Sequence, residues 1–158
     1  MTRASAPFAM PTRGKQPDFL VDTSVAVALV VADHEFHLQT LKAIGHRRLG
    51  LAGHAAFETF SVLTRLPSPV RRSPRVVARL LYENFPENRY LSAAGAEKLI
   101  ETLGKAGIAG GSVYDALVGA TAIEHHLKLA TRDQRALVTY RALQVEVEVL
   151  SDQDPGRA

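Results

Sequence analysis

The chain of 158 residues is long enough for one domain, which would bury about 68–70% of the surface that the unfolded chain exposes. Its composition, 46% hydrophobic and 22% charged residues, excludes disordered, collagen-like and coiled-coil proteins. The absence of cysteine excludes disulfides, thiolate metal sites and thiol nucleophiles, so any metal must bind oxygen or imidazole ligands. The net charge of +3 mildly favours a polyanionic partner.

The chain offers no membrane-spanning segment. Its longest apolar run, residues 25–32, holds eight residues, whereas about 20 are needed to cross a bilayer. Residues 1–17 carry basic residues and prolines without the apolar stretch of a signal peptide, so we expect a disordered tail there. We expect one domain over residues 18–152, a short tail at 153–158 and a cytoplasmic location.

Short apolar runs alternate with helical patterns along the whole chain. Cap residues precede several of the helical segments, and glycine or proline follows others. In chain order, the sequence predicts a strand at 19–21, helices at 25–31 and 33–47, a strand at 49–52, helices at 54–66 and 75–84, a strand at 89–91, helices at 95–105 and 112–127, and strands at 128–131 and 144–150.

Strands that are separated by helices favour right-handed crossovers and a mainly parallel central sheet. The predicted fold class is therefore α/β, with helices on both faces of the sheet in three layers. In such sheets the carboxyl ends of the strands and the amino ends of the helices lie at one edge, where ligands bind. That edge is where we expect the functional site.

Four acidic residues from distant parts of the chain should meet at this edge. Asp22 ends the first predicted strand and Asp133 follows the strand at 128–131. Glu58 and Asp115 lie in the first turns of two helices that begin at the same edge. Their convergence follows from topology alone.

Each acid also has a purely structural interpretation. Asp22 and Asp133 could cap the helices that follow them, and Glu58 could lie on a solvated helix face. Ser112 and Asp115 have the spacing of a capping box. The helix that Asp115 begins is apolar on all sides and therefore buried, so this carboxylate needs a partner.

No lysine or arginine lies one helical turn from Asp115, which excludes a local salt bridge. Bringing two carboxylates within ~5 Å costs roughly 3 kcal/mol at an effective dielectric of ~20. A cluster of acids therefore persists only when it is protonated or holds a cation. Oxygen ligands select Mg²⁺, or Mn²⁺ as a substitute, and such an ion can bind phosphate and activate water.

The four acids stand in sequence motifs that resemble a known family. Residues 18–150 are similar to PIN-domain ribonucleases, in particular to the VapC toxins of type II toxin-antitoxin systems. The motifs that carry this resemblance are FLVDTS at 19–24, AAFETFSVLTRL at 55–66, YDALVGA at 114–120 and LATRD at 129–133.

The resemblance implies a PIN-like fold and an Mg²⁺-dependent endoribonuclease that acts as a toxin. It also implies cleavage that leaves 5′-phosphate and 3′-hydroxyl ends, a homodimer, and an antitoxin that blocks the site. In this resemblance the metal-binding and catalytic residues are Asp22, Glu58, Asp115 and Asp133, with Thr131 as the hydroxyl that orients Asp133 or substrate. The chain departs from the pattern at Arg135, where many relatives have another acid. This difference argues against a second tightly bound metal ion.

Other functions compete with this interpretation. One is an Mg²⁺-dependent phosphotransfer or phosphatase domain, although Ser24 stands where a phosphatase of the haloacid-dehalogenase type needs a second Asp, and Arg132 where a receiver domain needs Lys. Another is a non-catalytic RNA-binding module in which the acids only cap helices. Saturable Mg²⁺ binding would distinguish that module from an enzyme.

Basic and imidazole side chains outside the acidic motifs are weaker candidates. Arg72, Arg75 and Arg79 would share one face if they were helical, and they could contact RNA phosphates. A solvated helix face is the simpler interpretation of this cluster. His54 precedes Glu58 by one helical turn, which would place it at the rim of the site.

Overall fold

The computed structural model describes residues 16–151. In this range seven helices surround a four-stranded sheet in which every strand pair is parallel. The elements in chain order are β1 (Phe19–Val21), α1 (Thr23–Val30), α2 (His37–Ile44), β2 (Leu49–Leu51), α3 (His54–Arg65), α4 (Pro74–Asn84), α5 (Ala93–Ala106), α6 (Ser112–Glu124), β3 (Leu129–Thr131), α7 (Leu137–Ala142) and β4 (Val147–Val149).

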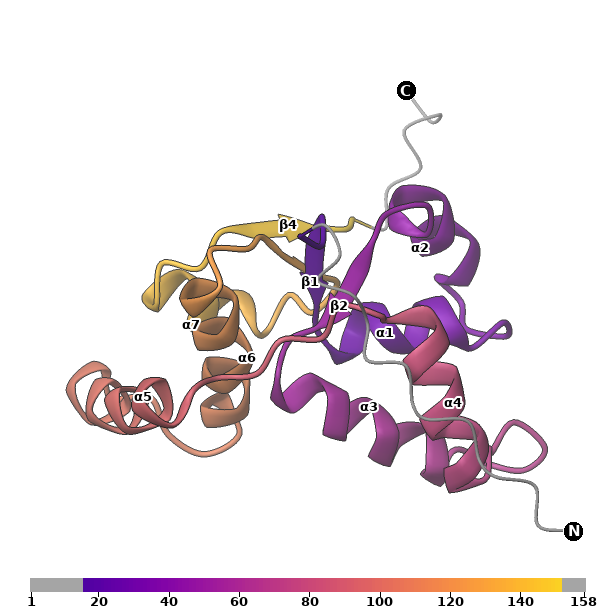
Figure 1. Ribbon diagram of the computed structural model, residues 1–158, viewed down its shortest axis with the longest axis horizontal. Helices are drawn as coiled ribbons and strands as arrows, with labels where there is room; N and C mark the ends of the chain where they lie inside the picture. Colours follow the sequence, from indigo (N-terminus) through magenta and orange to yellow (C-terminus); the bar gives the residue numbers. More distant parts are fainter. Residues whose placement is uncertain (1–15, 152–158) are drawn as a thin grey trace, which may run out of the picture.

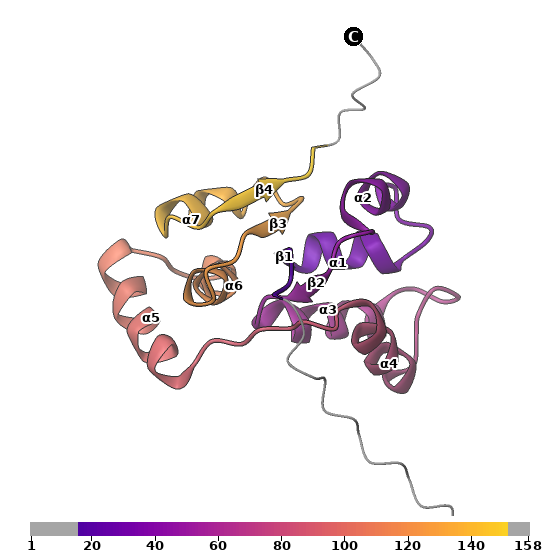
Figure 2. The same cartoon turned by 45° about the horizontal axis from the view of Figure 1, so that its top comes forward.

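The strand order in the sheet is β2-β1-β3-β4, so β1 lies between two strands that are distant in sequence. Val21 of β1 pairs with Leu51 of β2 and with Ala130 of β3. Helices α1 to α4 gather on one side of the strands and α5 to α7 on the other, as Figures 1 and 2 show. The predicted α/β class with flanking helices is confirmed.

The first three strands are buried throughout because helices cover both faces of the sheet. Their apolar side chains join those of α1, α3, α6 and α7 in the main core. Helix α5 packs instead on a small second core that consists of Leu99, Leu103 and Ala116. The acidic edge is thus held by the main core, and α5 is attached through α6.

Two predicted elements differ in the structure, and one helix was not predicted. The helix expected at 33–47 begins at His37, because residues 33–36 form tight turns in which His37 N donates to His34 O. The strand expected at 89–91 is a single bridge between Arg89 and Ala52, after which the chain leaves the sheet toward α5. Helix α7 was not predicted at all.

The tails expected at the two ends fall mainly on residues 1–15 and 152–158, which lie outside the described residues. Among the described helices, none is both long enough and apolar enough to cross a membrane.

Candidate functional site

Asp22 lies where β1 ends and α1 begins, and its side chain is buried. Its Oδ1 atom accepts hydrogen bonds from the Ser24 hydroxyl and, at 3.3 Å, from Val25 N, so the residue is the N-cap of α1. Its Oδ2 atom accepts from the Thr131 hydroxyl and, at 3.1 Å, from the Tyr140 hydroxyl. The capping interpretation of Asp22 is therefore correct, but it accounts for only one of the two carboxylate oxygens.

Burial raises the pKa of Asp22 above its ordinary value, while the hydrogen bonds from Ser24 and Thr131 oppose this rise. Burial and the nearby charge of Asp22 also raise the pKa of Tyr140. The phenol therefore remains protonated and acts as a donor to Asp22.

Asp133 follows β3 and is joined to Asp22 through Thr131. The Thr131 hydroxyl donates to Asp22 and accepts from Asp133 N at 3.0 Å. The Asp133 carboxylate accepts from Arg135 N at 2.9 Å, which closes a turn before α7. Because the N-cap position of α7 is Ala136, Asp133 does not cap that helix.

Glu58 lies in the second turn of α3 and is exposed. Its Oε2 atom accepts from the Thr23 hydroxyl at 2.8 Å, which ties α3 to the residue that follows Asp22. Gly53 begins α3 with φ +51°, and a Cβ there would stand 2.7 Å from the Thr121 hydroxyl of α6. Glycine at this position thus lets α3 approach α6, the helix that carries Asp115.

Asp115 lies in the first turn of α6 and is partly buried. The N-cap of α6 is Gly111, and no side chain caps this helix, so the capping-box interpretation is wrong. Burial and then the charges of Asp133, Asp22 and Glu58 raise the pKa of Asp115 from 3.8 to about 6. Asp133, Asp22 and Glu58 are therefore close enough to Asp115 for their charges to disfavour its ionised form.

The four acids supply oxygen donors of the type that Mg²⁺ and Mn²⁺ prefer. Asp133 forms an ion pair with Arg135 at 3.8 Å, and the Arg135 side chain is 96% exposed, so solvent screens this pair. As the side chains stand, no three acids or histidines in the described part of the chain are close enough to hold one ion. Binding would therefore require the carboxylates to move inward.

The arginine cluster lies apart from these acids in sequence and only partly on a helix. Arg72 precedes α4, and its side chain donates to Val70 O at 2.8 Å. Arg75 and Arg79 do share a face of α4, and Arg79 donates to Glu83 at 2.7 Å. Arg72 therefore does not share the helix face on which Arg75 and Arg79 lie.

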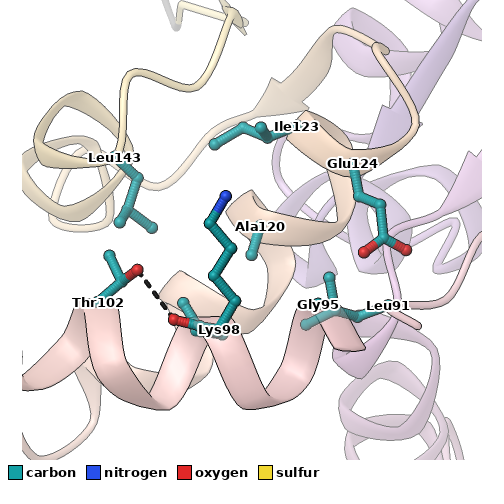
Figure 3. Close-up of a pocket in the computed structure, with 9 residues that line it drawn as sticks. Leu91, Gly95, Lys98, Thr102, Ala120, Ile123, Glu124 and Leu143 are labelled. Carbon is teal, nitrogen blue, oxygen red and sulfur yellow. Dashed lines mark hydrogen bonds between the residues drawn. The ribbon is translucent and has the colours of Figure 1, made fainter. Parts of the chain in front are cut away.

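A pocket of about 320 Å³ lies between α5 and α6, away from the four acids (Figure 3). The acid in its wall is Glu124, which accepts from Ser92 N at 2.8 Å and from the Ser92 hydroxyl at 2.9 Å. This carboxylate stabilises the start of α5, and its pKa is lowered by these bonds. The pocket therefore lacks the paired acids that a metal site requires.

Sequence reasoning missed Tyr140 because it missed α7. The available signal was weak: Leu137 and Tyr140 are three residues apart, which fits one turn of a helix but is too short a pattern to identify one. Sequence reasoning also assigned no role in the site to Ser24. Its hydroxyl donates to Asp22 and accepts from Arg132 N at 2.9 Å, which joins α1 to the chain that follows β3.

Comparisons with known proteins agree with this architecture. Residues 19–142 match the PIN domain family. The chain is 47% identical over 134 residues to ribonuclease VapC27 of Mycobacterium tuberculosis, covering 85% of this chain and 98% of that protein.

Solved structures with the same fold include VapC20 of Mycobacterium tuberculosis, a toxin that cleaves the sarcin-ricin loop. It has a TM-score of 0.61 at 20% identity, covering 76% of this chain and 93% of VapC20. VapBC2 from Rickettsia felis, bound to a DNA fragment from its promoter, has a TM-score of 0.60 at 14% identity, covering 84% of this chain and 98% of that one. The chain thus belongs to the PIN-domain family, within its group of VapC ribonucleases.

Proposed function

We propose that this protein is a metal-dependent endoribonuclease that acts as the toxin of a toxin-antitoxin pair. The observation that carries the proposal is the meeting of acids at the carboxyl edge of a parallel sheet, where Thr131 joins Asp22 to Asp133 and where the charges of the other acids raise the pKa of Asp115. The names of its relatives support RNA as the substrate, since VapC27 is a ribonuclease and VapC20 cleaves the sarcin-ricin loop.

In this proposal Asp22, Glu58, Asp115 and Asp133 hold Mg²⁺, with Mn²⁺ as a possible substitute. When bound, the ion would bind phosphate oxygens and lower the pKa of the water that attacks phosphorus. We expect products with 5′-phosphate and 3′-hydroxyl ends.

The surrounding side chains fix the geometry of the acids. Ser24, Thr131 and Tyr140 donate to Asp22 and hold its carboxylate in one orientation. Such outer partners usually affect metal affinity or activity by 10- to 100-fold. Glu58 is the most exposed of the four acids, and its Oε2 atom accepts from the Thr23 hydroxyl. We assign to Glu58 the role of orienting the attacking water and accepting its proton.

The toxin role implies a cognate antitoxin that inserts a basic side chain among the acids. The VapBC2 structure, in which a related fold is crystallised with its partner on DNA, supports this part of the proposal. A homodimer and a cytoplasmic location also belong to it. Arg72, Arg75 and Arg79 stay candidates for RNA contacts.

The non-catalytic alternative requires each acid to have only a capping role. Asp115 and Asp133 do not cap α6 or α7, which disfavours that alternative. No observation on the described residues favours the phosphotransfer alternative over the nuclease.

The proposal is tested by sequencing RNA 5′ ends after brief expression of the wild type and of Asp22→Asn. We expect new ends at defined positions for the wild type and none for the variant. Equal patterns of ends for the two proteins would contradict the proposal.

A further inference from the structure

Three exposed aromatic side chains lie on the elements that carry Glu58 and Asp115 or directly beside them. Phe57 on α3 is 67% exposed, Tyr114 on α6 is 53% exposed, and Tyr90 before α5 is 51% exposed. Together with His54 of α3 they form a group that we call the aromatic strip. Single exposed apolar side chains are ordinary, but a contiguous group of exposed rings is typical of a binding surface.

The rings of the aromatic strip form two contacting pairs. Tyr114 stacks on His54, with ring centroids 4.8 Å apart and an interplanar angle of 21°. Phe57 and Tyr90 have centroids 6.3 Å apart at 59°. His54 and Phe57 are three residues apart on α3, so they are neighbours on the helix surface. The strip thus runs from α6 across α3 to the segment that precedes α5.

The backbone beneath the strip is held in place. The segment that joins α4 to α5 crosses close to the start of α3 in both ribbon views (Figures 1 and 2). Gly53 N donates to Arg89 O at 2.7 Å, and a His125 ring nitrogen lies 2.9 Å from Tyr90 O. The exposed rings therefore stand on a fixed surface, and a ligand would lose little free energy in ordering them.

The strip borders the acids on two elements. Glu58 lies one helical turn after His54, and Asp115 directly follows Tyr114. From this arrangement we infer that the aromatic strip is a base-stacking subsite, which holds unpaired nucleobases of the RNA strand beside the phosphodiester bond to be cleaved. The inference rests on the proposed function and assigns to the same site the residues that contact bases.

The chemistry of the strip suits nucleobases. An RNA strand presents charged phosphates and flat apolar bases in alternation, and this surface has acids for a metal-bound phosphate next to rings for bases. Stacking on aromatic side chains contributes to single-strand binding for any base, because every base has a π-face. None of these rings lines the pocket of Figure 3, so the strip is separate from that pocket.

Stacking on this surface requires bases that are free of a duplex, because bases in A-form RNA are covered by their neighbours. An unstructured RNA is therefore the appropriate substrate for a test of the strip.

Single-turnover cleavage of an unstructured, 5′-labelled RNA in Mg²⁺ tests the inference, with the protein concentration varied. We expect Phe57→Ala to raise the protein concentration for half-maximal rate at least about fivefold, the lower end of what a stacked base contributes. The rate at saturation should change less than about twofold, since Phe57 is assigned to base binding and has no group that could bind metal or transfer a proton. Ile100→Ala is the matched control, because Ile100 on α5 is 70% exposed and outside the strip.

Two further variants separate stacking from general apolar contact. Phe57→Tyr keeps an aromatic ring and should bind RNA like the wild type, whereas Phe57→Leu keeps apolar surface only and should resemble Phe57→Ala. An RNA that lacks one base next to the cleaved bond should lose affinity with the wild type. That same RNA should lose little more with Phe57→Ala, because the base and the ring act as one contact.

The outcomes distinguish this inference from the proposed function. If the wild type cleaves RNA and Phe57→Ala has an unchanged half-maximal concentration, the strip is not a base site and the proposed function stands. Full affinity of Phe57→Leu, or an equal loss with Ile100→Ala, would assign the surface to contact with a protein and overturn the inference. If the wild type cleaves no RNA in Mg²⁺, the proposed function and the inference both fail.

Discussion

The two ends of the central sheet carry charges in opposite arrangements. At the amino end, Lys128 precedes β3 and pairs at 3.4 Å with Glu146, which precedes β4. Asp18 precedes β1 and accepts from Arg48 N at 2.9 Å, directly before β2. At the carboxyl end, four acids meet with weak compensation from Arg135.

Two buried carboxylates make the difference clear. Glu87, next to the amino end of β2, is 7% exposed and forms ion pairs with Arg48 and Arg89. Asp22 at the carboxyl end is 5% exposed and is held by hydroxyl and backbone donors. A paired buried acid has its charge balanced within the fold, whereas a buried acid beside other acids keeps a charge that a proton or a cation can balance. We therefore expect the acids at the carboxyl end to lower the stability of the metal-free protein and to favour a bound cation.

The largest effect should come from removing an acid at the carboxyl end. Asp22→Asn, Asp115→Asn and Asp133→Asn should each lower the rate of Mg²⁺-dependent RNA cleavage by at least about 100-fold, because partners outside the ligand shell already cost 10- to 100-fold. The far-UV circular dichroism spectrum should stay native. Near-wild-type cleavage by purified Asp115→Asn would remove that residue from the site.

The matching change at the amino end should affect stability instead of cleavage. Glu87→Gln leaves Arg48 and Arg89 without their carboxylate, but both guanidinium groups are partly solvated, with 44% and 26% of the side chain exposed. We expect a loss of about 1–2 kcal/mol in unfolding free energy, or roughly 2–8 °C in Tm. Cleavage should stay within about twofold of the wild type. A loss of cleavage without a loss of stability would break the distinction between the two ends.

A smaller effect is expected from a residue that acts through Asp22. Tyr140→Phe removes the hydroxyl that lies 3.1 Å from Asp22 Oδ2 and leaves the ring in the core. The Mg²⁺ concentration for half-maximal cleavage should rise about tenfold. Tyr82→Phe, which removes an exposed tyrosine hydroxyl on α4, is the control and should leave the Mg²⁺ dependence unchanged. If both variants titrate like the wild type, the Tyr140 bond has no role in orienting Asp22.

The smallest effect should follow from the exposed pair at the amino end. Lys128→Gln removes a pair whose side chains are 41% and 72% exposed, and such pairs contribute less than about 1 kcal/mol. Urea unfolding at low salt should show a small loss that disappears at 1 M salt, where charges are screened. A loss that persists at high salt would mean that Lys128 stabilises the fold by packing.

The sequence predicted the parts of the site that follow from chain topology. Asp22 and Asp133 end parallel strands and Asp115 begins a helix, so an α/β pattern places all three at one edge. Residue 58 lies in the second turn of its helix, so it is displaced from the edge, and its bond from Thr23 depends on how α3 packs. The topology of the acids was predictable because it depends on periodicity and order alone.

Side-chain partners across elements were less predictable. The bond from Tyr140 to Asp22 joins residues 118 apart, and α7, with six residues, is too short for a clear periodic signal. Ser112 and Asp115 have the spacing of a capping box, but the described structure places Gly111 at the cap. Local spacing thus suggested a cap, although the surroundings of Asp115 come from β1, α3 and the loop after β3.

Thermal melts of the wild type and Asp115→Asn in EDTA and in Mg²⁺ test most directly that the acids at the carboxyl end repel one another. Because the folded pKa of Asp115 is about 6 and its ordinary value is 3.8, the metal-free wild type should lose stability as pH rises from about 4 to about 7. Asp115→Asn should melt roughly 2–4 °C higher than the wild type in EDTA at pH 7.5. This difference in Tm corresponds to ~1 kcal/mol of unfolding free energy. The value is smaller than the whole pKa shift of Asp115 would give, because solvent reaches the carboxylate and screens its interactions.

That difference in Tm should shrink as pH falls toward 4, and Mg²⁺ should raise the Tm of the wild type while leaving that of the variant nearly unchanged. The contrary result is a lower Tm for Asp115→Asn in EDTA together with no effect of Mg²⁺ on the wild type. It would mean that Asp115 stabilises the metal-free fold and that the four acids do not form a metal site.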